Sequence, residues 1–337
     1  MIWIALLVFA GLMNGSFALP MKITTRWKWE HTWSMWSVWA LLVIPWCMAL
    51  LTVPRLFSIY IAVGFADILV VFLFGLGWGV ASVAFGKGID YLGIGLGYSL
   101  MMGLIISIGA ILPLFLSRQP VAASTILAIA AGVGTIVAGL IFSAWAAVIK
   151  EKDTAKAEAK KESGASKSFA KGVIICLITG VIAPMLNLAF IYGNKIASEA
   201  VESGASPIYA SNATWAVALT GGFIINFFYC MFIVARKNSW RFYTEKGTGK
   251  YYFFTFLMGL SWAGSILTYG IAGSNMGALG SSIGWALFNT IGIFWANCLG
   301  LLTGEWRNVS RKGLVIMSAG LAVLLVGVFI VGWANSR

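Results

Sequence analysis

Residues 72–78 read Phe-Leu-Phe-Gly-Leu-Gly-Trp, and residues 256–262 read Phe-Leu-Met-Gly-Leu-Ser-Trp. The same spacing of 184 residues pairs Phe85-Gly86 with Tyr269-Gly270, and Gly93 with Gly277. Apolar helices often resemble each other by chance, but a register shared through a helix, a turn and the next helix is less common. The sequence therefore predicts that the second half of the chain repeats the first.

The composition around these stretches is that of a membrane protein. Of the 337 residues, 60% are hydrophobic and 10% are charged, and the mean hydropathy is +0.90. A soluble domain has about half apolar and a quarter charged residues. The net charge of +12 is spread between apolar runs rather than along one face. The chain is thus not a soluble enzyme, a disordered chain or a nucleic-acid-binding protein, and its expected surroundings are a lipid bilayer.

Ten apolar runs have the length of about 20 residues that a membrane helix needs. We therefore predict an all-α polytopic membrane protein with ten transmembrane helices. The runs are Ile2–Leu19, Thr32–Val53, Phe65–Phe85, Tyr91–Leu114, Ala122–Val148, Gly172–Tyr192, Tyr209–Val234, Tyr251–Ala272, Met276–Leu302 and Gly313–Trp333.

The basic residues are distributed unevenly between the connections. Of the 23 Lys and Arg residues, all but Arg55, Arg118, Lys195 and Arg337 fall in the odd-numbered connections. Cytoplasmic loops carry the excess of Lys and Arg in membrane proteins. The odd connections are therefore predicted to be cytoplasmic and both termini to lie outside.

A charged linker at residues 150–171 divides the ten runs into five and five, at 1–149 and 172–337. We expect this linker to be solvated, cytoplasmic and at most partly helical. Because five is odd, the second copy enters the membrane from the opposite side, which makes two inverted five-helix repeats. Many secondary transporters that work by alternating access have this architecture. No nucleotide-binding motif is seen, so transport is expected to use a gradient.

Polar side chains inside these runs are candidates for binding a solute. Asn14 and Asn187 lie in the first helices of the two halves, near Pro20 and Pro184, and could either bind a solute or pack against a neighbouring helix. Trp285 and Asn289 share one helix face, and an aromatic plane beside an amide suits a sugar. The expected substrate-binding residues are Asn14, Phe17, Trp78, Asn187, Asn226, Trp262, Tyr269, Trp285 and Asn289.

Two groups of tryptophans receive different interpretations. Trp78 and Trp262 occupy equivalent mid-helix positions of the repeats, where cavity lining and core packing are both open. The tryptophans near the start of the second run are expected to form mostly an interfacial belt. These are Trp27, Trp29, Trp33, Trp36 and Trp39.

Few ionisable groups lie within or near the runs. Asp67 has no basic residue within reach along its own helix, so it is the candidate for proton coupling, and an exposed helix cap is the alternative. Glu30 is expected to cap the second helix or to pair with Lys28. The four cysteines lie in separate runs and His31 is the only histidine, so we expect no disulfide, metal site, cofactor or catalytic residue.

Residues 14–22 (Asn-Gly-Ser-Phe-Ala-Leu-Pro-Met-Lys) and 27–34 (Trp-Lys-Trp-Glu-His-Thr-Trp-Ser) resemble the N-terminal signature of the L-rhamnose–proton symporter family, in the drug/metabolite transporter superfamily. The resemblance implies ten helices in two inverted repeats. It also implies uptake of a deoxy sugar with a proton across the bacterial inner membrane. Residues 274–284 depart from the family, some members of which carry ionisable or amide-rich residues there, so the proton-binding group is not transferable by position.

Four other functions are alternatives. Uptake of a different sugar, or export of apolar metabolites or drugs, would keep the inverted repeat. A receptor or scaffold would leave that repeat without a purpose, and no run pairs a nucleophile with a base as an enzyme would require. The sequence leaves the oligomeric state undetermined.

Overall fold

The computed structural model describes residues 2–116, 122–157, 169–277, 280–304, 306, 307 and 309–334, and these residues form helices and turns without a strand. A helix makes its backbone hydrogen bonds within its own segment, so an apolar segment in a bilayer folds as a helix. The elements are α1 (Ile2–Ser16), η1 (Leu19–Lys22), α2 (Trp29–Ser37), η2 (Val38–Val43), α3 (Ile44–Thr52), α4 (Leu56–Val63), α5 (Phe65–Leu116), α6 (Ala123–Ala157), α7 (Phe169–Ile182), α8 (Met185–Tyr192), α9 (Asn194–Glu202), α10 (Ser211–Arg236), η3 (Trp240–Tyr243), α11 (Gly249–Ser274), α12 (Gly280–Leu302) and α13 (Arg311–Ala334).

Nine segments of the described chain are long and apolar enough to cross a membrane. A tenth apolar helix, Leu100–Leu116, is shorter. The spans agree with the predicted runs except at this fourth position. The nine are Ile2–Lys22, Trp29–Thr52, Phe65–Ile89, Ala123–Lys150, Ala170–Glu202, Ser211–Arg236, Gly249–Ser274, Gly280–Leu302 and Arg311–Ala334.

Helix α5 folds back on itself. The rings of Phe85 and Tyr98 lie 5.7 Å apart, although 13 residues of straight helix would extend about 20 Å. A side chain at Gly97 would also lie 3.0 Å from the carbonyl oxygen of Gly88. The chain therefore turns between residues 88 and 97. It forms a first arm (65–88) and a second arm (97–116), at the places of the predicted runs Phe65–Phe85 and Tyr91–Leu114.

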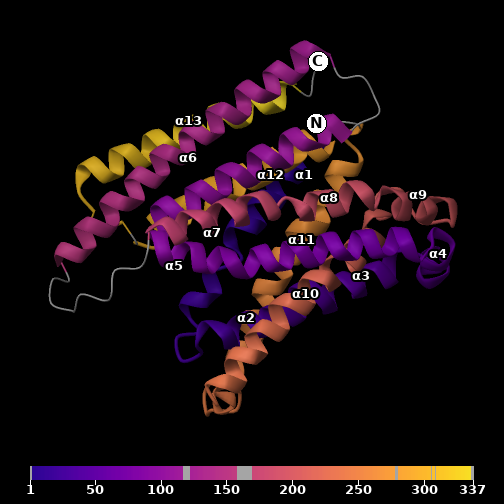
Figure 1. The fold of residues 1–337 in the computed structure, drawn as a ribbon, viewed down its shortest axis with the longest axis horizontal. Helices are drawn as coiled ribbons and strands as arrows, with labels where there is room; N and C mark the ends of the chain where they lie inside the picture. The colour runs from indigo at the N-terminus through magenta and orange to yellow at the C-terminus, as the bar shows by residue number, and fades with distance from the viewer. Residues whose placement is uncertain are drawn as a thin grey trace.

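The connections gather at two ends of the molecule (Figure 1). Both termini, α4 and α9 lie toward one end, which we call the terminal end. At the other end, which we call the basic end, lie the loops around η1 and η3, the turn of α5 and the end of α6. Helix α6 continues to Ala157, and residues 158–168 of the predicted linker lie outside the described residues, as do Arg118 and Arg337.

Prolines interrupt the first helices of the two halves in different ways. Helix α1 ends at Ser16, and Pro20 lies in the separate turn η1, so this proline follows the helix rather than breaking it. In the second half, Pro184 stands between α7 and α8, because its missing N–H and its ring end the helical hydrogen bonding. Asn187 then follows in the first turn of α8.

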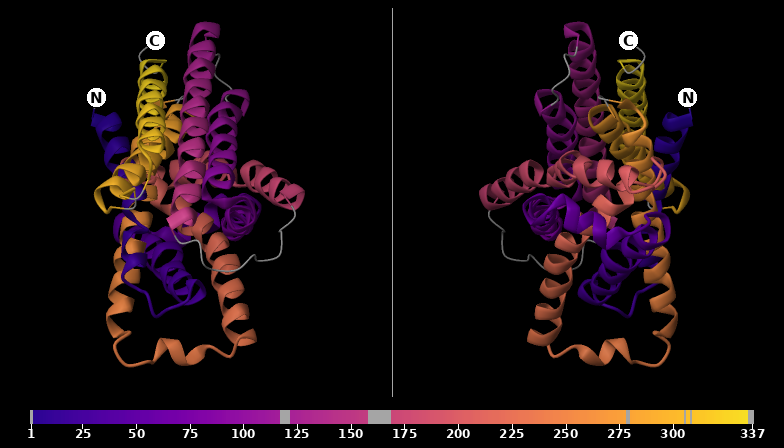
Figure 2. Two further views of the ribbon diagram at one scale, coloured as in Figure 1. Left: turned by 90° about the vertical axis from the view of Figure 1, so that its left-hand side faces the viewer. Right: turned by 90° about the vertical axis from the view of Figure 1, so that its right-hand side faces the viewer.

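Glycines allow close crossings between the two halves. Added methyl groups at Gly75 would collide with the backbone of Ala218 on α10. At Gly259 on α11, the collision would be with Trp39 and Ala40 in η2. Helices α6 and α13 lie side by side at the edge of the bundle (Figure 2).

Candidate functional site

A cavity of about 400 Å³ lies between the two halves of the chain. Its walls come from the end of α1, from α2, from both arms of α5, from the break between α7 and α8, and from α11 and α12. Pockets for small ligands have about 300–1,000 Å³. Six predicted substrate-binding residues line it: Asn14, Phe17, Trp78, Trp262, Trp285 and Asn289.

Trp78 and Trp262 stack on each other in the wall of the cavity. Their ring centroids lie 5.3 Å apart and the ring planes meet at 21°. Trp36 packs edge-on against Trp262 at 5.3 Å. The indole nitrogen of Trp36 is buried and, among the described residues, has no hydrogen-bond partner. Both interpretations of the tryptophan pair therefore hold, because the two rings line the cavity and pack together.

Three polar groups in the wall keep hydrogen-bonding capacity. Asn289 donates from its amide nitrogen to the Trp285 carbonyl at 2.9 Å, and within the described residues its amide oxygen is unpaired. The Asn14 amide and the Tyr98 hydroxyl likewise form no hydrogen bond with the described residues, and both residues line the cavity. Among the residues that the structure describes, the lining contains no charged side chain and no histidine. Such a wall suits a neutral solute that has an apolar face and hydroxyl groups.

The other three predicted substrate-binding residues lie behind the wall. The Tyr269 hydroxyl donates to the Asn187 amide oxygen at 2.6 Å, and both side chains are buried. The Asn187 nitrogen donates to the carbonyls of Gly109 and Ser281, at 2.8 Å each. This set forms what we call the amide junction. The observed role of Asn187 is therefore helix–helix bonding, one of the two alternatives considered.

Asn226 is also buried, and both its amide oxygen and its amide nitrogen form hydrogen bonds. Its amide oxygen accepts from Trp33 at 2.9 Å and from Ser82 at 3.0 Å, and its nitrogen donates to the Gly222 carbonyl. It reaches the cavity through Trp33 and Ser82, which line it.

The expectation of an interfacial tryptophan belt is wrong for part of its members. Trp27 and Trp36 are buried, and Trp33 and Trp36 line the cavity. Trp33 and Trp36 are three residues apart and share one helix face, which is the signal that could have identified them. Tyr98 and Phe85 also line the cavity and were missed, because the sequence predicts a turn between their two helices but not which side chains of those helices meet.

Asp67 is not the isolated carboxyl that its own helix indicates. It forms an ion pair with Lys195 of α9. The Asp67 and Lys195 side chains are 44% and 60% exposed. Because the pair lies near the start of α5 at the terminal end, Asp67 does not line the cavity. The premise of an unpaired group is wrong, since the partner comes from the other half.

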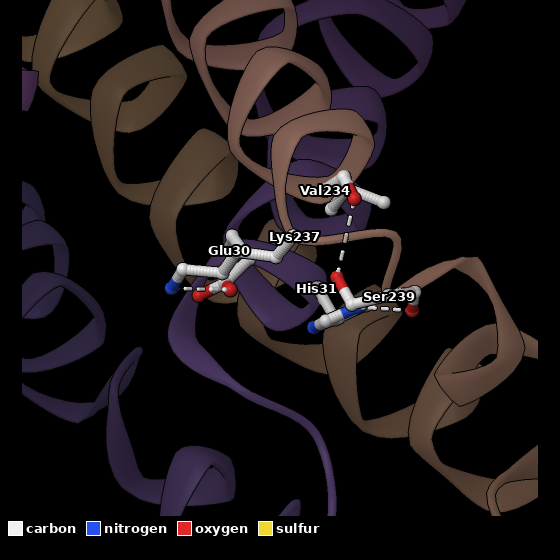
Figure 3. A network of polar contacts seen from close by, with 5 residues as sticks. All are labelled: Glu30, His31, Val234, Lys237 and Ser239. Atoms are coloured by element: carbon white, nitrogen blue, oxygen red, sulfur yellow. Dashed lines mark hydrogen bonds and ion pairs between the residues drawn. The ribbon is translucent and has the colours of Figure 1, made fainter.

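Glu30 and His31 are buried at the basic end (Figure 3). Glu30 accepts from the Lys237 ammonium at 3.0 Å, so the expected pairing with Lys28 is wrong. The His31 Nε2 atom lies 2.9 Å from the Ser239 carbonyl oxygen. Ser34 lies 2.7 Å from the Tyr243 hydroxyl, and Trp27 donates to the Phe242 carbonyl at 2.7 Å. We call this set of contacts the charged junction.

Comparison with known proteins gives a consistent result over the whole chain. Residues 1–336 match the family described as L-rhamnose-proton symport protein. A relative from Mannheimia succiniciproducens, named L-rhamnose-proton symporter, is 24% identical and covers 96% of this chain and 95% of its own. Relatives of the same name from Escherichia coli O17:K52:H18 and Cronobacter sakazakii are 25% and 24% identical over 94% of this chain and 92% of theirs. The chain belongs to the L-rhamnose-proton symport protein family.

Proposed function

We propose that this protein imports L-rhamnose, or a similar 6-deoxyhexose, together with a proton across the bacterial cytoplasmic membrane. The observation that carries the proposal is the cavity between the two halves, whose described lining is aromatic and uncharged, in a chain that matches the symporter family along its length. A sugar presents a C–H face for stacking and hydroxyls for hydrogen bonds.

Three observations support ten membrane helices in two inverted repeats, at 1–149 and 172–337. The equivalent residues Trp78 and Trp262 stack on each other, as residues near a two-fold axis would. Equivalent glycines, Gly75 and Gly259, make close crossings with α10 and η2, which belong to the opposite halves. The two arms of α5 supply the third and fourth helices. An inverted pair of this kind permits alternating access to one cavity.

The distribution of charge supports an orientation. The loops of the basic end contain most of the Lys and Arg residues, and both termini lie toward the other end. By the positive-inside preference, the basic end faces the cytoplasm and both termini face outward. The cavity extends along the end of α1 and the residues that follow it, from Asn14 to Ala18, and along the middle of α12, from Trp285 to Ala296.

The sugar-binding roles follow from the wall of the cavity. Trp262 and Trp78 offer ring faces to the C–H face of the sugar, and Trp285 and Phe17 add apolar surface. Asn14 and Asn289 offer amide groups to the hydroxyls. The remaining predicted residues, Asn187, Tyr269 and Asn226, support the wall from behind.

The test is transport in sealed vesicles that contain the purified protein. Addition of L-rhamnose outside, without an imposed gradient, should make the medium alkaline as protons enter with the sugar. Sugar uptake with no movement of protons would remove the coupling claim. Absence of L-rhamnose uptake, in protein that is folded by thermal unfolding, would contradict the substrate assignment.

Export of apolar solutes by a drug/metabolite transporter is the second candidate, and the mostly apolar wall favours it. The two functions differ in what exchanges across the membrane. Vesicles loaded with unlabelled L-rhamnose should accumulate labelled L-rhamnose by counterflow if the first proposal holds. Counterflow of hydrophobic amines without counterflow of L-rhamnose would support the exporter.

A further inference from the structure

The charged junction contains a carboxylate, an ammonium group and an imidazole, none of which is present in the described lining of the cavity. Of the acidic side chains that the structure describes, Glu30 alone is buried. Figure 3 shows its carboxylate directed at Lys237 and His31 directed at the loop after α10. Resting on the proposed function, we propose that Glu30 carries the coupled proton and that its pairing with Lys237 marks the proton-free state.

The pair joins the two halves of the chain. Glu30 is in the first turn of α2, and Lys237 directly follows α10. The Glu30 side chain is 5% exposed and the Lys237 side chain is 60% exposed. Protonation of Glu30 would break the pair, and the Lys237 ammonium would then be stabilised by water. A buried acid with an exposed partner can therefore exchange a proton without leaving an isolated charge in the interior.

The pair is connected to the cavity through one turn of helix. Trp33 lies three residues after Glu30 on the same face of α2 and lines the cavity. Its indole nitrogen donates to Asn226 on α10, three turns before Lys237. A movement between α2 and α10 would thus change the ion pair and the cavity wall together.

The surroundings of Glu30 contain few other titratable groups. On α2 the neighbour is His31, whose Nδ1 atom is buried and has no partner among the described residues. Cys230 lies on α10 and Lys237 directly follows that helix, and η3 contributes Tyr243, which lies beside Tyr252 of α11. Lys237 is the only permanent cation in this set, so it is the group that favours the ionised carboxylate.

The proton step balances without another reactant. In the state open to the outside, the Glu30 carboxylate accepts one proton and becomes a neutral acid while Lys237 remains an ammonium ion. In the state open to the cytoplasm, the acid releases the same proton to water and the ion pair forms again. No other bond changes.

The test compares Glu30→Gln with Asp67→Asn in vesicles of the full-length protein. One proton per sugar allows about tenfold accumulation for each pH unit of gradient. Glu30→Gln should lose this accumulation and the proton movement but keep L-rhamnose counterflow, because the amide imitates the protonated acid. Asp67→Asn should keep about tenfold accumulation per pH unit. Coupling retained in Glu30→Gln, or lost only in Asp67→Asn, would overturn the inference.

A second variant decides the matter if Glu30→Gln also loses counterflow. Lys237→Gln removes the exposed cation, so a buried ionised carboxylate loses its partner. The pH of half-maximal uptake should then shift to more alkaline values, and an unchanged midpoint would overturn the inference. A wild-type protein with neither uptake nor counterflow would instead contradict the proposed function, which separates the two failures.

Discussion

The two junctions that join the halves of this protein differ in chemistry. The amide junction uses neutral groups: Asn187 binds Tyr269 and the carbonyls of Gly109 and Ser281. The charged junction uses an ion pair and a histidine. The Asn187 and Tyr269 side chains of the first are buried, whereas Lys237 in the second is largely exposed.

This difference indicates which junction can respond to pH. Fixed amide, hydroxyl and carbonyl dipoles do not change with protonation in the physiological range. Leaving a buried hydrogen bond of this kind unmade costs free energy. The amide junction therefore stays closed unless its helices move apart together. The charged junction has a group that water can solvate once the pair opens. In the proposed cycle, protonation therefore acts on the charged junction at the basic end, and the amide junction closes the cavity on the opposite side.

Asn187→Ala should have the largest effect on stability, because it removes all three hydrogen bonds of the amide junction. It leaves two carbonyls and one hydroxyl without partners, which costs about 3 kcal/mol or more. The measurement is the thermal unfolding midpoint in detergent. Asn297→Ala is the matched control, since among the described residues the Asn297 side chain bonds only to the Ile293 carbonyl of its own helix. Equal losses in the two variants would show that the junction contributes nothing beyond an ordinary asparagine.

Gly75→Ala should have the next largest effect, because it separates α5 from α10 between the two junctions. The added methyl group collides with the Ala218 backbone, which cannot rotate away. Overpacking of this kind costs about 1–3 kcal/mol. The control is Gly86→Ala in the same arm, where no heavy atom lies within 4 Å of the new carbon. Thermal unfolding of both variants measures the effect, and similar midpoints would contradict the close crossing.

Much of the fold could be predicted from the sequence, because an apolar run of sufficient length forms a helix in a bilayer. The runs, the break at Pro184 and the placement of the basic loops all follow from local composition. The turn of α5 also follows from the separate runs Phe65–Phe85 and Tyr91–Leu114, and the contacts of Phe85 with Tyr98 and of Gly88 with Gly97 agree with it. The sequence does not predict which side chains of the two arms meet.

The site was predictable where the repeat guided the choice and less so elsewhere. Equivalent positions identified Trp78 and Trp262, and helix periodicity identified Trp285 with Asn289. The partners of Asp67 and Glu30, by contrast, come from the other half of the chain. Pairings between distant segments depend on packing that no local pattern contains, so these two carboxyls were assigned incorrect surroundings.

Trp262→Phe should weaken L-rhamnose binding without disturbing either junction. The smaller ring loses part of its stacking with the sugar and with Trp78, and aromatic stacking contributes about 0.5–1.5 kcal/mol, or about 2- to 12-fold in affinity. Calorimetric titration measures the change. Trp145→Phe is the control, because Trp145 is half exposed on the outer face of α6. Equal affinity in the Trp262 variant and the wild type would place the sugar away from the stacked pair.

Tyr243→Phe should have the smallest effect, and it would sharpen the contrast between the junctions at alkaline pH. Burial raises the pKa of Tyr243 to about 12, against an ordinary value of 10. Because the folded state keeps this proton longer than the unfolded chain, stability should fall as the pH rises above about 10. The phenylalanine variant should lose part of that slope, together with a hydrogen bond of about 1 kcal/mol to Ser34. Unfolding midpoints between about pH 9 and 11 measure it, with the exposed Tyr209→Phe as the control. An unchanged slope in Tyr243→Phe would mean that this phenol does not contribute to the pH response of the charged junction.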